Sequence, residues 1–127
     1  MGSNKKVLVI DDEPHIRRVI ELKLKKGGYD VFTAANGVEG LNVINTLQPE
    51  VVISDINMPK LDGKTLCEMT DDLKRERPFL TIIITARISP DEENWISKMH
   101  HTLFMEKPFS PARLLESIDQ YFERRGK

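Results

Sequence analysis

The sequence predicts an α/β fold: a (βα)5 three-layer sandwich with a five-stranded parallel sheet. Strand-like apolar runs and helix-like amphipathic stretches alternate five times along the 127 residues. The strand-like runs are apolar on both faces, which is typical of parallel sheets that helices cover on both sides. The alternation implies right-handed crossovers, and the length suits one domain that spans residues 1–127.

The first half of the chain predicts three strands and two helices. In order, they are Val7–Ile10, a helix opened by Pro14 and ended by Gly27-Gly28, Asp30–Ala34, a helix capped by Asn36, and Val51–Ser54. Proline suits the first turn of a helix, and glycine suits its end. Asparagine is a good N-cap because its side chain can accept a hydrogen bond from the first turn.

The second half of the chain predicts three helices and two strands. In order, they are a helix that carries Leu66, Met69 and Leu73 and ends by Pro78, Leu80–Ile84, a helix that begins at Ser89, Leu103–Glu106, and a helix opened by Ser110-Pro111. Ser89 and Glu92 have the spacing of a capping box. The last helix has an apolar face of Leu114, Leu115, Ile118, Tyr121 and Phe122.

Composition narrows the function classes. Nineteen basic residues nearly balance twenty acidic ones, and a net charge of −1 gives no support for direct nucleic-acid or membrane binding. No apolar run approaches the ~20 residues of a membrane helix, and the polar segment Met1–Lys6 lacks a signal peptide's apolar region. A single cysteine, Cys67, cannot form an internal disulfide and fits a cytoplasmic location.

Polar side chains follow four of the expected strands. Asp11 and Asp12 come after the first, Asp55 after the third, Thr85 after the fourth and Lys107 after the fifth. Because the carboxyl ends of parallel strands converge on one crevice, these side chains are expected to meet. Three carboxylates and one ammonium carry a formal charge of about −2. A divalent cation would neutralise this charge, and the hard oxygen ligands suit Mg²⁺ or Mn²⁺ rather than zinc.

Each of these residues has a simpler interpretation when it is taken alone. Adjacent acids at a helix start are more often caps than ligands, Asp55 could cap the loop that follows it, and threonine is common in strands. Together, however, Thr85 and Lys107 supply a neutral donor and a cation beside the acids. A phosphoryl group on Asp55 would need both, and a carboxylate can act as the nucleophile for such a group.

Four short segments, in their order and spacing, resemble the receiver domain of two-component response regulators. They are Val7–Pro14, Asp55–Pro59 with Asp62-Gly63, Thr85–Arg87 and Lys107–Phe109. The resemblance extends over a core of residues 5 to about 124. It implies a flavodoxin-like, CheY-like sheet with the strand order 2-1-3-4-5.

The resemblance also implies a role for each site residue. Asp55 would be the phosphoacceptor, and a histidine kinase or a histidine phosphotransfer protein would be the donor. Asp12, Asp55 and the backbone carbonyl of Asn57 would bind Mg²⁺ directly, and Asp11 would act through a metal-bound water. Lys107 would pair with the phosphoryl oxygens.

In such a protein, phosphorylation acts as a switch. Thr85 would turn its hydroxyl toward the phosphoryl group, and Phe104 could enter the space that Thr85 leaves. Phe104 could also be an ordinary core residue of the fifth strand, or fill both roles. The helix that begins at Ser89, the fifth strand and the last helix would form the output face. An unknown downstream protein or output domain would read this face. The peptide bond before Pro108 would be cis.

Three side chains near the output face depart from the family pattern or stand out within it. His100 and His101 occupy positions where the family usually has Gly-Ala, so the preceding helix lacks a glycine stop. Both histidines are expected to be exposed to solvent. Trp95 is interpreted either as a partner contact or as a partly packed side chain.

Two alternative functions stay open on the sequence alone. A Mg²⁺-dependent aspartyl-phosphate phosphatase would resemble this fold, but such enzymes usually need a second acid two residues after the nucleophile, where Asn57 stands. A pseudo-receiver that serves only as a docking module would not need the intact set of site residues. The expected protein is therefore a signalling phosphoacceptor and not an enzyme that turns over an external substrate.

Overall fold

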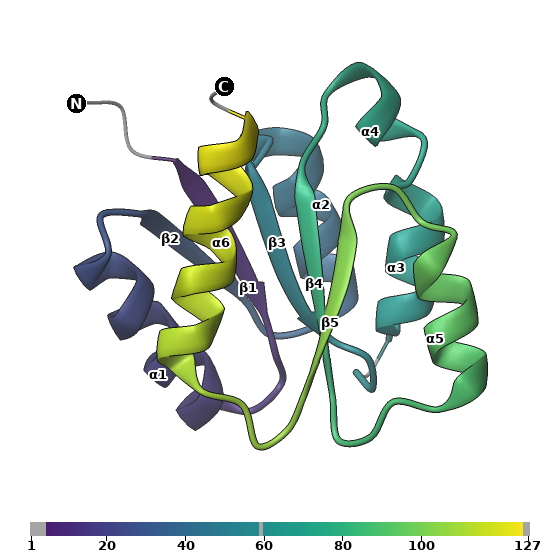
Figure 1. Ribbon diagram of the computed structural model, residues 1–127, viewed down its shortest axis with the longest axis horizontal. Coiled ribbons are helices and arrows are strands. Elements are labelled where there is room, and N and C mark those ends of the chain that lie inside the picture. Colours follow the sequence, from purple (N-terminus) through teal and green to yellow (C-terminus); the bar gives the residue numbers. More distant parts are fainter. Residues whose placement is uncertain (1–4, 59, 126–127) are drawn as a thin grey trace.

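The computed structural model describes residues 5–58 and 60–125, which surround a parallel five-stranded sheet in the order β2-β1-β3-β4-β5 (Figure 1). The strands are β1 (Lys6–Ile10), β2 (Asp30–Ala34), β3 (Val51–Asp55), β4 (Leu80–Thr85) and β5 (Thr102–Glu106). Every neighbouring pair is parallel. The predicted fold class and the strand order are confirmed. Pro59 of the quoted motif, and residues 1–4 and 126–127 of the expected domain, lie outside the described residues.

Helices cover both faces of this sheet. They are α1 (Pro14–Lys26), α2 (Gly37–Leu47), α3 (Gly63–Thr70), α4 (Leu73–Glu76), α5 (Pro90–Ser97) and α6 (Pro111–Arg125). In Figure 1, α1 and α6 lie on one face, and α2, α3 and α5 lie on the other, in agreement with the residues that pack together. Among the described residues, no helix combines the length and the apolar character that crossing a membrane requires.

The third helix differs from its prediction in two ways. It breaks after Thr70, so that Leu73 packs from the separate helix α4. Met69 was expected on the apolar face but is 53% exposed. The inward stripe of α3 is formed by Leu66, Cys67 and Thr70. Met69 falls to the side of this stripe, because at 3.6 residues per turn it lies about 60° around the helix from Leu66, on the side away from Cys67 and Thr70.

The predicted helix starts agree with the structure. Pro14 begins α1, and Oδ1 of Asn36 accepts a hydrogen bond from the N–H of Glu39 at 3.0 Å. Ser89 and Glu92 form a complete capping box, in which each side chain accepts from the other residue's backbone N–H at 3.1 Å. The start of α5 is therefore well defined directly after the loop that leaves β4.

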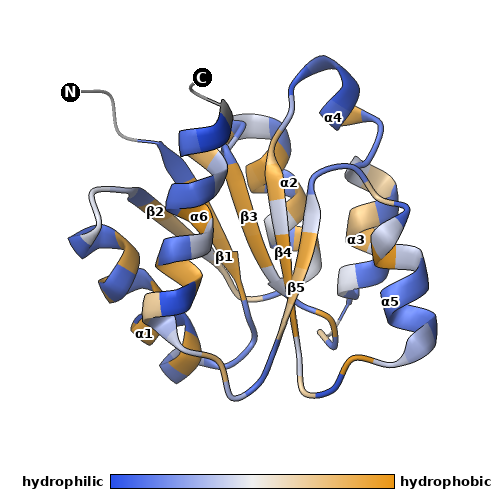
Figure 2. Cartoon of the chain, in the orientation of Figure 1, coloured by the Kyte–Doolittle hydropathy of each residue, from blue (hydrophilic) through white to orange (hydrophobic). Residues whose placement is uncertain are grey.

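Apolar side chains fill both interfaces between the sheet and the helices. Toward α1 and α6, the buried residues include Val7, Val9, Ile20, Leu24, Leu114 and Ile118. Toward α2 and α3, they include Leu8, Ile10, Ile44, Leu66 and Phe79. Figure 2 shows the inner strands as mostly hydrophobic, while the outer turns of α5 and α6 are hydrophilic. This arrangement explains why β1, β3 and β4 are apolar on both faces.

Two residues of uncertain role prove to be core residues. Trp95 is only 8% exposed and packs with Ile83 and Ile96 between the sheet and α5. The interpretation of Trp95 as a partner contact is therefore wrong. Cys67 lies in the same cluster, and burial raises the pKa of its thiol to about 12. Cys67 is thus a packing residue, because reactivity requires the thiolate.

The strand β5 is more exposed than its sequence predicts. Leu103 is exposed, and Phe104 is 38% exposed, so Phe104 is not an ordinary core residue. In the part of the chain that the structure describes, β5 lies at the edge of the sheet and pairs with β4 alone. Side chains at an edge strand have neighbours on one side only, and an apolar run alone does not distinguish an edge strand from a central one.

The turn between α5 and β5 carries the two histidines. Both are exposed, as predicted. Without a glycine stop, α5 ends at Ser97, and His101 takes a left-handed φ of 48°. His100 is held by Asp71: its ring Nδ1 lies 2.9 Å from Oδ2 of Asp71, and its backbone N–H donates to Oδ1 at 2.9 Å.

Lys74 in α4 is a buried lysine, and it bonds to the same turn. The residue is only 4% exposed. The ammonium donates to the backbone oxygen of His100 at 2.6 Å and to Oγ1 of Thr102 at 3.0 Å. It also lies 4.9 Å from the ring centroid of Phe79. Burial lowers the pKa of Lys74 to about 8, which means that folding disfavours its charged form.

Replacing Lys74 with methionine should remove a rise in stability between pH 8 and pH 10.5. The pKa of Lys74 is about 8 in the folded protein, against an ordinary value of 10.5. Since the unfolded chain binds the proton more tightly in this window, the free energy of unfolding rises with pH. The contribution of Lys74 should be about 3 kcal/mol, measured as the difference between the wild type and Lys74→Met in how the free energy of unfolding changes with pH.

Urea unfolding of both proteins at about pH 7 and about pH 10.5 measures this rise. Cys67 and other groups titrate in both proteins, so their effects cancel in the comparison. The exposed Lys98, replaced by methionine, is the matched control and should leave the rise unchanged. A Lys74→Met protein with the wild-type pH dependence would contradict the prediction.

Candidate functional site at the carboxyl edge of the sheet

The ends of four strands meet at one edge of the sheet, at the bottom of Figure 1. Asp11 follows β1, Asp55 ends β3, Thr85 ends β4 and Lys107 follows β5. The ends of β4 and β5 are joined directly, since the N–H of Lys107 donates to the backbone oxygen of Thr85 at 2.7 Å. The structure therefore brings residues from distant parts of the sequence to one edge.

Asp11, Asp12 and Asp55 form a cluster in which one carboxylate oxygen of each lies within 4.8 Å of the others. Asp11 and Asp55 are buried, whereas Asp12 is exposed. The N–H of Glu13 donates to Oδ1 of Asp11 at 2.9 Å, and the N–H of Asn57 donates to Oδ1 of Asp55 at 3.2 Å. The turns that follow the strands thus hold both buried carboxylates in place.

Lys107 closes the cluster from β5. Its Nζ lies 2.7 Å from Oδ2 of Asp55 and 3.8 Å from Oε1 of Glu13. Burial alone would lower the pKa of Lys107, but the hydrogen bond to Asp55 and the nearby carboxylates outweigh burial and raise it. Lys107 is therefore a cation held against Asp55. The bond between Lys107 and Pro108 is cis.

The charges of this cluster fit a divalent cation. Asp11, Asp12, Asp55 and Glu13 against Lys107 give a formal charge of −3, four carboxylates less one ammonium. Burial raises the pKa of Asp11, and the charge of Asp55 raises it further against the hydrogen bond from Glu13. A hard cation among the carboxylate oxygens would offset this repulsion, so the donor set suits Mg²⁺ or Mn²⁺.

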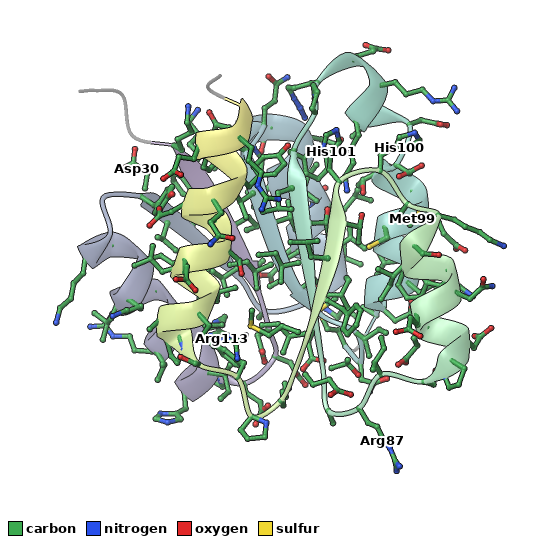
Figure 3. The ribbon with its side chains drawn as sticks, in the orientation of Figure 1. Asp30, Arg87, Met99, His100, His101 and Arg113 are labelled. Atoms are coloured by element: carbon green, nitrogen blue, oxygen red, sulfur yellow. The ribbon has the colours of Figure 1, made fainter. Side chains whose placement is uncertain are left out.

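The hydroxyl of Thr85 bonds within its own loop. Oγ1 donates to the backbone oxygen of Arg87 at 3.2 Å and accepts from the N–H of Arg87 at 3.4 Å. Figure 3 shows the side chain of Arg87 extending away from the sheet at this edge. The Thr85 hydroxyl is therefore hydrogen-bonded to backbone groups of Arg87 and not to its guanidinium.

Three side chains at this edge are missing from the predicted site. Glu13 approaches Lys107, and Nη1 of Arg17 donates to the backbone oxygen of Asp11 at 2.8 Å. Oε2 of Glu106 accepts from the N–H of Ile88 at 2.7 Å. The position of Glu13, directly after the acidic pair, could have pointed to it. The contacts of Arg17 and Glu106 depend on side-chain conformations that spacing in the sequence does not show.

Gly63 lets α3 approach the end of β3. A Cβ atom on Gly63 would lie 2.7 Å from the backbone oxygen of Asp55 and 2.9 Å from Cα of Ile56. The N–H of Gly63 donates to the backbone oxygen of Ile56 at 2.9 Å. The absence of a side chain at this position is thus part of how the fold positions Asp55.

Gly63→Ala should lower the free energy of unfolding by about 1–3 kcal/mol, because backbone atoms of β3 would have to move aside. Gly27→Ala is the matched control. The three atoms nearest to a Cβ on Gly27 all belong to the flexible side chain of Leu115, the nearest at 2.6 Å. Urea unfolding compares the two variants. A Gly63→Ala protein as stable as the wild type, or more stable than Gly27→Ala, would contradict the expected crowding.

The fold and the site together define a class of protein. An acidic cluster with an adjacent ammonium lies at the carboxyl edge of a 2-1-3-4-5 sheet, the edge at which open α/β sheets bind their ligands. This class is the CheY-like α/β fold with an acidic site at its switch point. The chain belongs to the response regulator receiver domain family, whose family model matches residues 7–119. It is accordingly a signalling domain of the two-component system rather than a classical enzyme.

Solved receiver domains share this structure. The Francisella response regulator 1452 receiver domain superposes with a TM-score of 0.85 at 32% sequence identity, over 96% of this chain and 99% of that chain. The chemotaxis response regulator CheY4 of Vibrio cholerae gives a TM-score of 0.83 at 30% identity, over 93% of this chain and 98% of that chain.

Curated relatives are longer proteins with names that refer to transcription. The "Alkaline phosphatase synthesis transcriptional regulatory protein PhoP" of Bacillus subtilis is 36% identical over 121 residues, which is 95% of this chain and 50% of PhoP. The "Probable transcriptional regulator ycf27" of Porphyridium aerugineum is 37% identical over 122 residues, which is 96% of this chain and 50% of the relative. The chain thus spans about half the length of these relatives.

Proposed function

We propose that this receiver domain accepts a phosphoryl group on Asp55 in a Mg²⁺-dependent reaction, with a histidine kinase or a histidine phosphotransfer protein as the donor. One observation carries the proposal. Asp55 is 7% exposed, and its carboxylate belongs to the acidic cluster and lies 2.7 Å from the Lys107 ammonium. A carboxylate held between a cation site and an ammonium has the surroundings that phosphoryl transfer requires of its nucleophile.

In the transfer step, a carboxylate oxygen of Asp55 attacks the phosphorus of the donor phosphohistidine. The new P–O bond forms as the P–N bond breaks, and the imidazole leaves with the electron pair. Lys107 is close enough to exchange its bond with Asp55 for one with a phosphoryl oxygen. Asp12, Asp55 and the carbonyl of Asn57 would hold Mg²⁺, with Asp11 acting through a metal-bound water. Bound Mg²⁺ supplies positive charge for the phosphoryl oxygens.

Phosphorylation would then change the output face. A phosphoryl group adds about −1.5 to −2 charges at neutral pH. Thr85 would leave its bonds with Arg87 and turn toward this charge, and the exposed ring of Phe104 would move into the space that Thr85 vacates. The affected face consists of α5, β5 and α6. Moving a two-state domain from 1:99 to 99:1 takes about 5.5 kcal/mol, to which new bonds from Thr85 and Lys107 would contribute.

The output itself is a further part of the proposal. Relatives with transcription in their names match this chain over about half their length. We therefore propose that the receiver controls transcription from the cytoplasm, through an output domain or a downstream protein. The receiver would carry out only its own phosphorylation and dephosphorylation. Asn57 has no carboxylate to act as the general acid of a phosphatase, which counts against turnover of external phosphoesters.

Intact-mass measurement tests the proposal. After incubation with acetyl phosphate and Mg²⁺, the protein should gain the mass of one phosphoryl group, and EDTA should prevent the gain. A protein whose mass stays unchanged under these conditions would contradict the proposed function.

A further inference from the structure

We propose that Glu106 is a positioning residue that holds the loop between β4 and α5 in its unphosphorylated conformation. The inference rests on the proposed function of Asp55 and goes beyond it, because Glu106 lies outside the acidic cluster. The loop covers residues 86–89, between the end of β4 and the start of α5. It contains Arg87, whose backbone bonds to the Thr85 hydroxyl.

The carboxylate of Glu106 holds one end of this loop. Its Oε2 accepts from the N–H of Ile88 at 2.7 Å. The next N–H, that of Ser89, donates to Oε1 of Glu92 at 3.1 Å. Both amides that lead into α5 are therefore bonded to carboxylates. Glu92 belongs to α5 itself, whereas Glu106 reaches across from β5, so the bond to Ile88 ties the loop to a neighbouring strand.

The end of β5 also holds the other end of the loop. Thr85 pairs with Glu106 in the register of the sheet. The N–H of Lys107 donates to the backbone oxygen of Thr85 at 2.7 Å. Glu106, the last residue of β5, and Lys107, which follows it, thus fix Ile88 on one side of Arg87 and Thr85 on the other. This double attachment keeps the backbone of Arg87 within reach of the Thr85 hydroxyl.

The attachment also connects the loop to the core beneath α5. Ile88 packs against the buried cluster that lies between the sheet and α5, namely Ile56, Cys67, Ile83, Trp95 and Ile96. Ile88 is therefore held both by its bond to Glu106 and by this packing. A movement of the loop at Ile88 requires that the bond to Glu106 breaks or that α5 shifts. Glu106 therefore acts on the position of Thr85 and on the start of α5 together.

The expected consequence is a bias toward the resting state. Thr85 has one hydroxyl proton, so it can donate to a phosphoryl group on Asp55 only after its bond to the backbone oxygen of Arg87 breaks. An anchor that favours this bond stabilises the unphosphorylated conformation, and a ligand shifts an equilibrium only by its differential affinity for the two states. Removing the anchor should therefore make the phosphorylated conformation easier to reach, and ligands that resemble the phosphoryl group should bind more tightly.

Three substitutions separate the bond from the charge of Glu106. Alanine removes the acceptor, aspartate keeps the charge but shortens the reach by one methylene, and glutamine keeps the reach and an acceptor oxygen without the charge. Beryllofluoride with Mg²⁺ is the probe for the phosphorylated conformation. Glu106→Ala and Glu106→Asp should bind it about three- to tenfold more tightly than the wild type. The affinity of Glu106→Gln should lie between those of the wild type and Glu106→Ala. Glu93→Gln, which removes the same charge from the first turn of α5, should match the wild type.

A second measurement reads the anchor without any phosphoryl analogue. In the wild-type protein, the Ile88 amide proton should exchange slowly and resonate downfield because it bonds to a carboxylate. In Glu106→Ala, it should move upfield and exchange about tenfold faster. In Glu106→Gln, it should retain part of the protection.

The outcomes distinguish this inference from the proposed function. A wild-type protein that binds beryllofluoride, together with a Glu106→Ala protein of equal or lower affinity, would overturn the role of Glu106 alone. An Ile88 amide that is unchanged in Glu106→Ala would overturn it as well. A wild-type protein without any response to beryllofluoride would overturn the proposed function and this inference with it.

Discussion

Asp55→Asn should take up no phosphoryl group from acetyl phosphate under conditions in which the wild-type protein takes up one. The amide has nearly the size and shape of the carboxylate, but it lacks the negative oxygen that attacks phosphorus. The substitution also removes the charge that holds Lys107 at 2.7 Å. Since the change combines loss of the nucleophile with loss of a proposed metal ligand, incorporation should fall below detection rather than decrease partially.

Intact mass and Mg²⁺ dependence check this result. The matched control is Asp72→Asn, which makes the same chemical change at an exposed aspartate beside α4. Asp72→Asn should incorporate phosphate as the wild type does. If Asp55→Asn retained the mass gain, the phosphoacceptor would be another residue and the assignment of Asp55 would be wrong.

Asp12→Asn should weaken Mg²⁺ binding by at least about tenfold. Asp12 is the exposed member of the cluster, and its carboxylate oxygen lies within 4.8 Å of those of Asp11 and Asp55. Its removal takes away a proposed ligand and reduces the negative charge that attracts the cation. Because Asp12 is exposed, the free energy of unfolding without metal should change little.

Calorimetric titration with Mg²⁺ measures this affinity, and Mn²⁺ can replace Mg²⁺ where a paramagnetic readout is needed. Glu13→Gln is the matched control, because it removes one neighbouring charge without removing a proposed ligand. It should reduce the affinity less than Asp12→Asn does, since it acts only through the electric field. Equal affinity in Asp12→Asn and the wild type would contradict the role of Asp12.

The elements follow from features that are local in the sequence. Strand-like runs of four or five residues identify the strands, and caps such as Asn36 and Ser89 identify helix starts. The order 2-1-3-4-5 comes from the family resemblance, because periodicity alone does not show which strands are neighbours. The exposure of Phe104 and Met69 was not predicted, since it depends on how far the neighbouring elements cover each side chain, which residue type and periodicity do not show.

The site, too, could be predicted from the sequence only in part. Asp11, Asp55, Thr85 and Lys107 are found from their positions after strands, because parallel strands bring those positions to one edge. The contacts that Glu106 makes are invisible in the sequence. They depend on the rotamer of an exposed side chain and on the path of a loop, neither of which follows from residue type and spacing.

The bonds of Lys74 and Asp71 have a consequence for how a signal can leave this domain. Both join the α3–α4 region to the turn before β5, and Figure 3 places His100 and His101 at the edge opposite Arg87. The edge of the sheet with His100 and His101 is held by these bonds, whereas the edge with Asp55 depends on a few side-chain bonds that can exchange partners. A rearrangement that begins at Asp55 should therefore involve β5 and the first turn of α5, and the edge with His100 and His101 should keep its structure. A binding partner would then contact a surface that changes along β5 and α5 beside a surface that does not change.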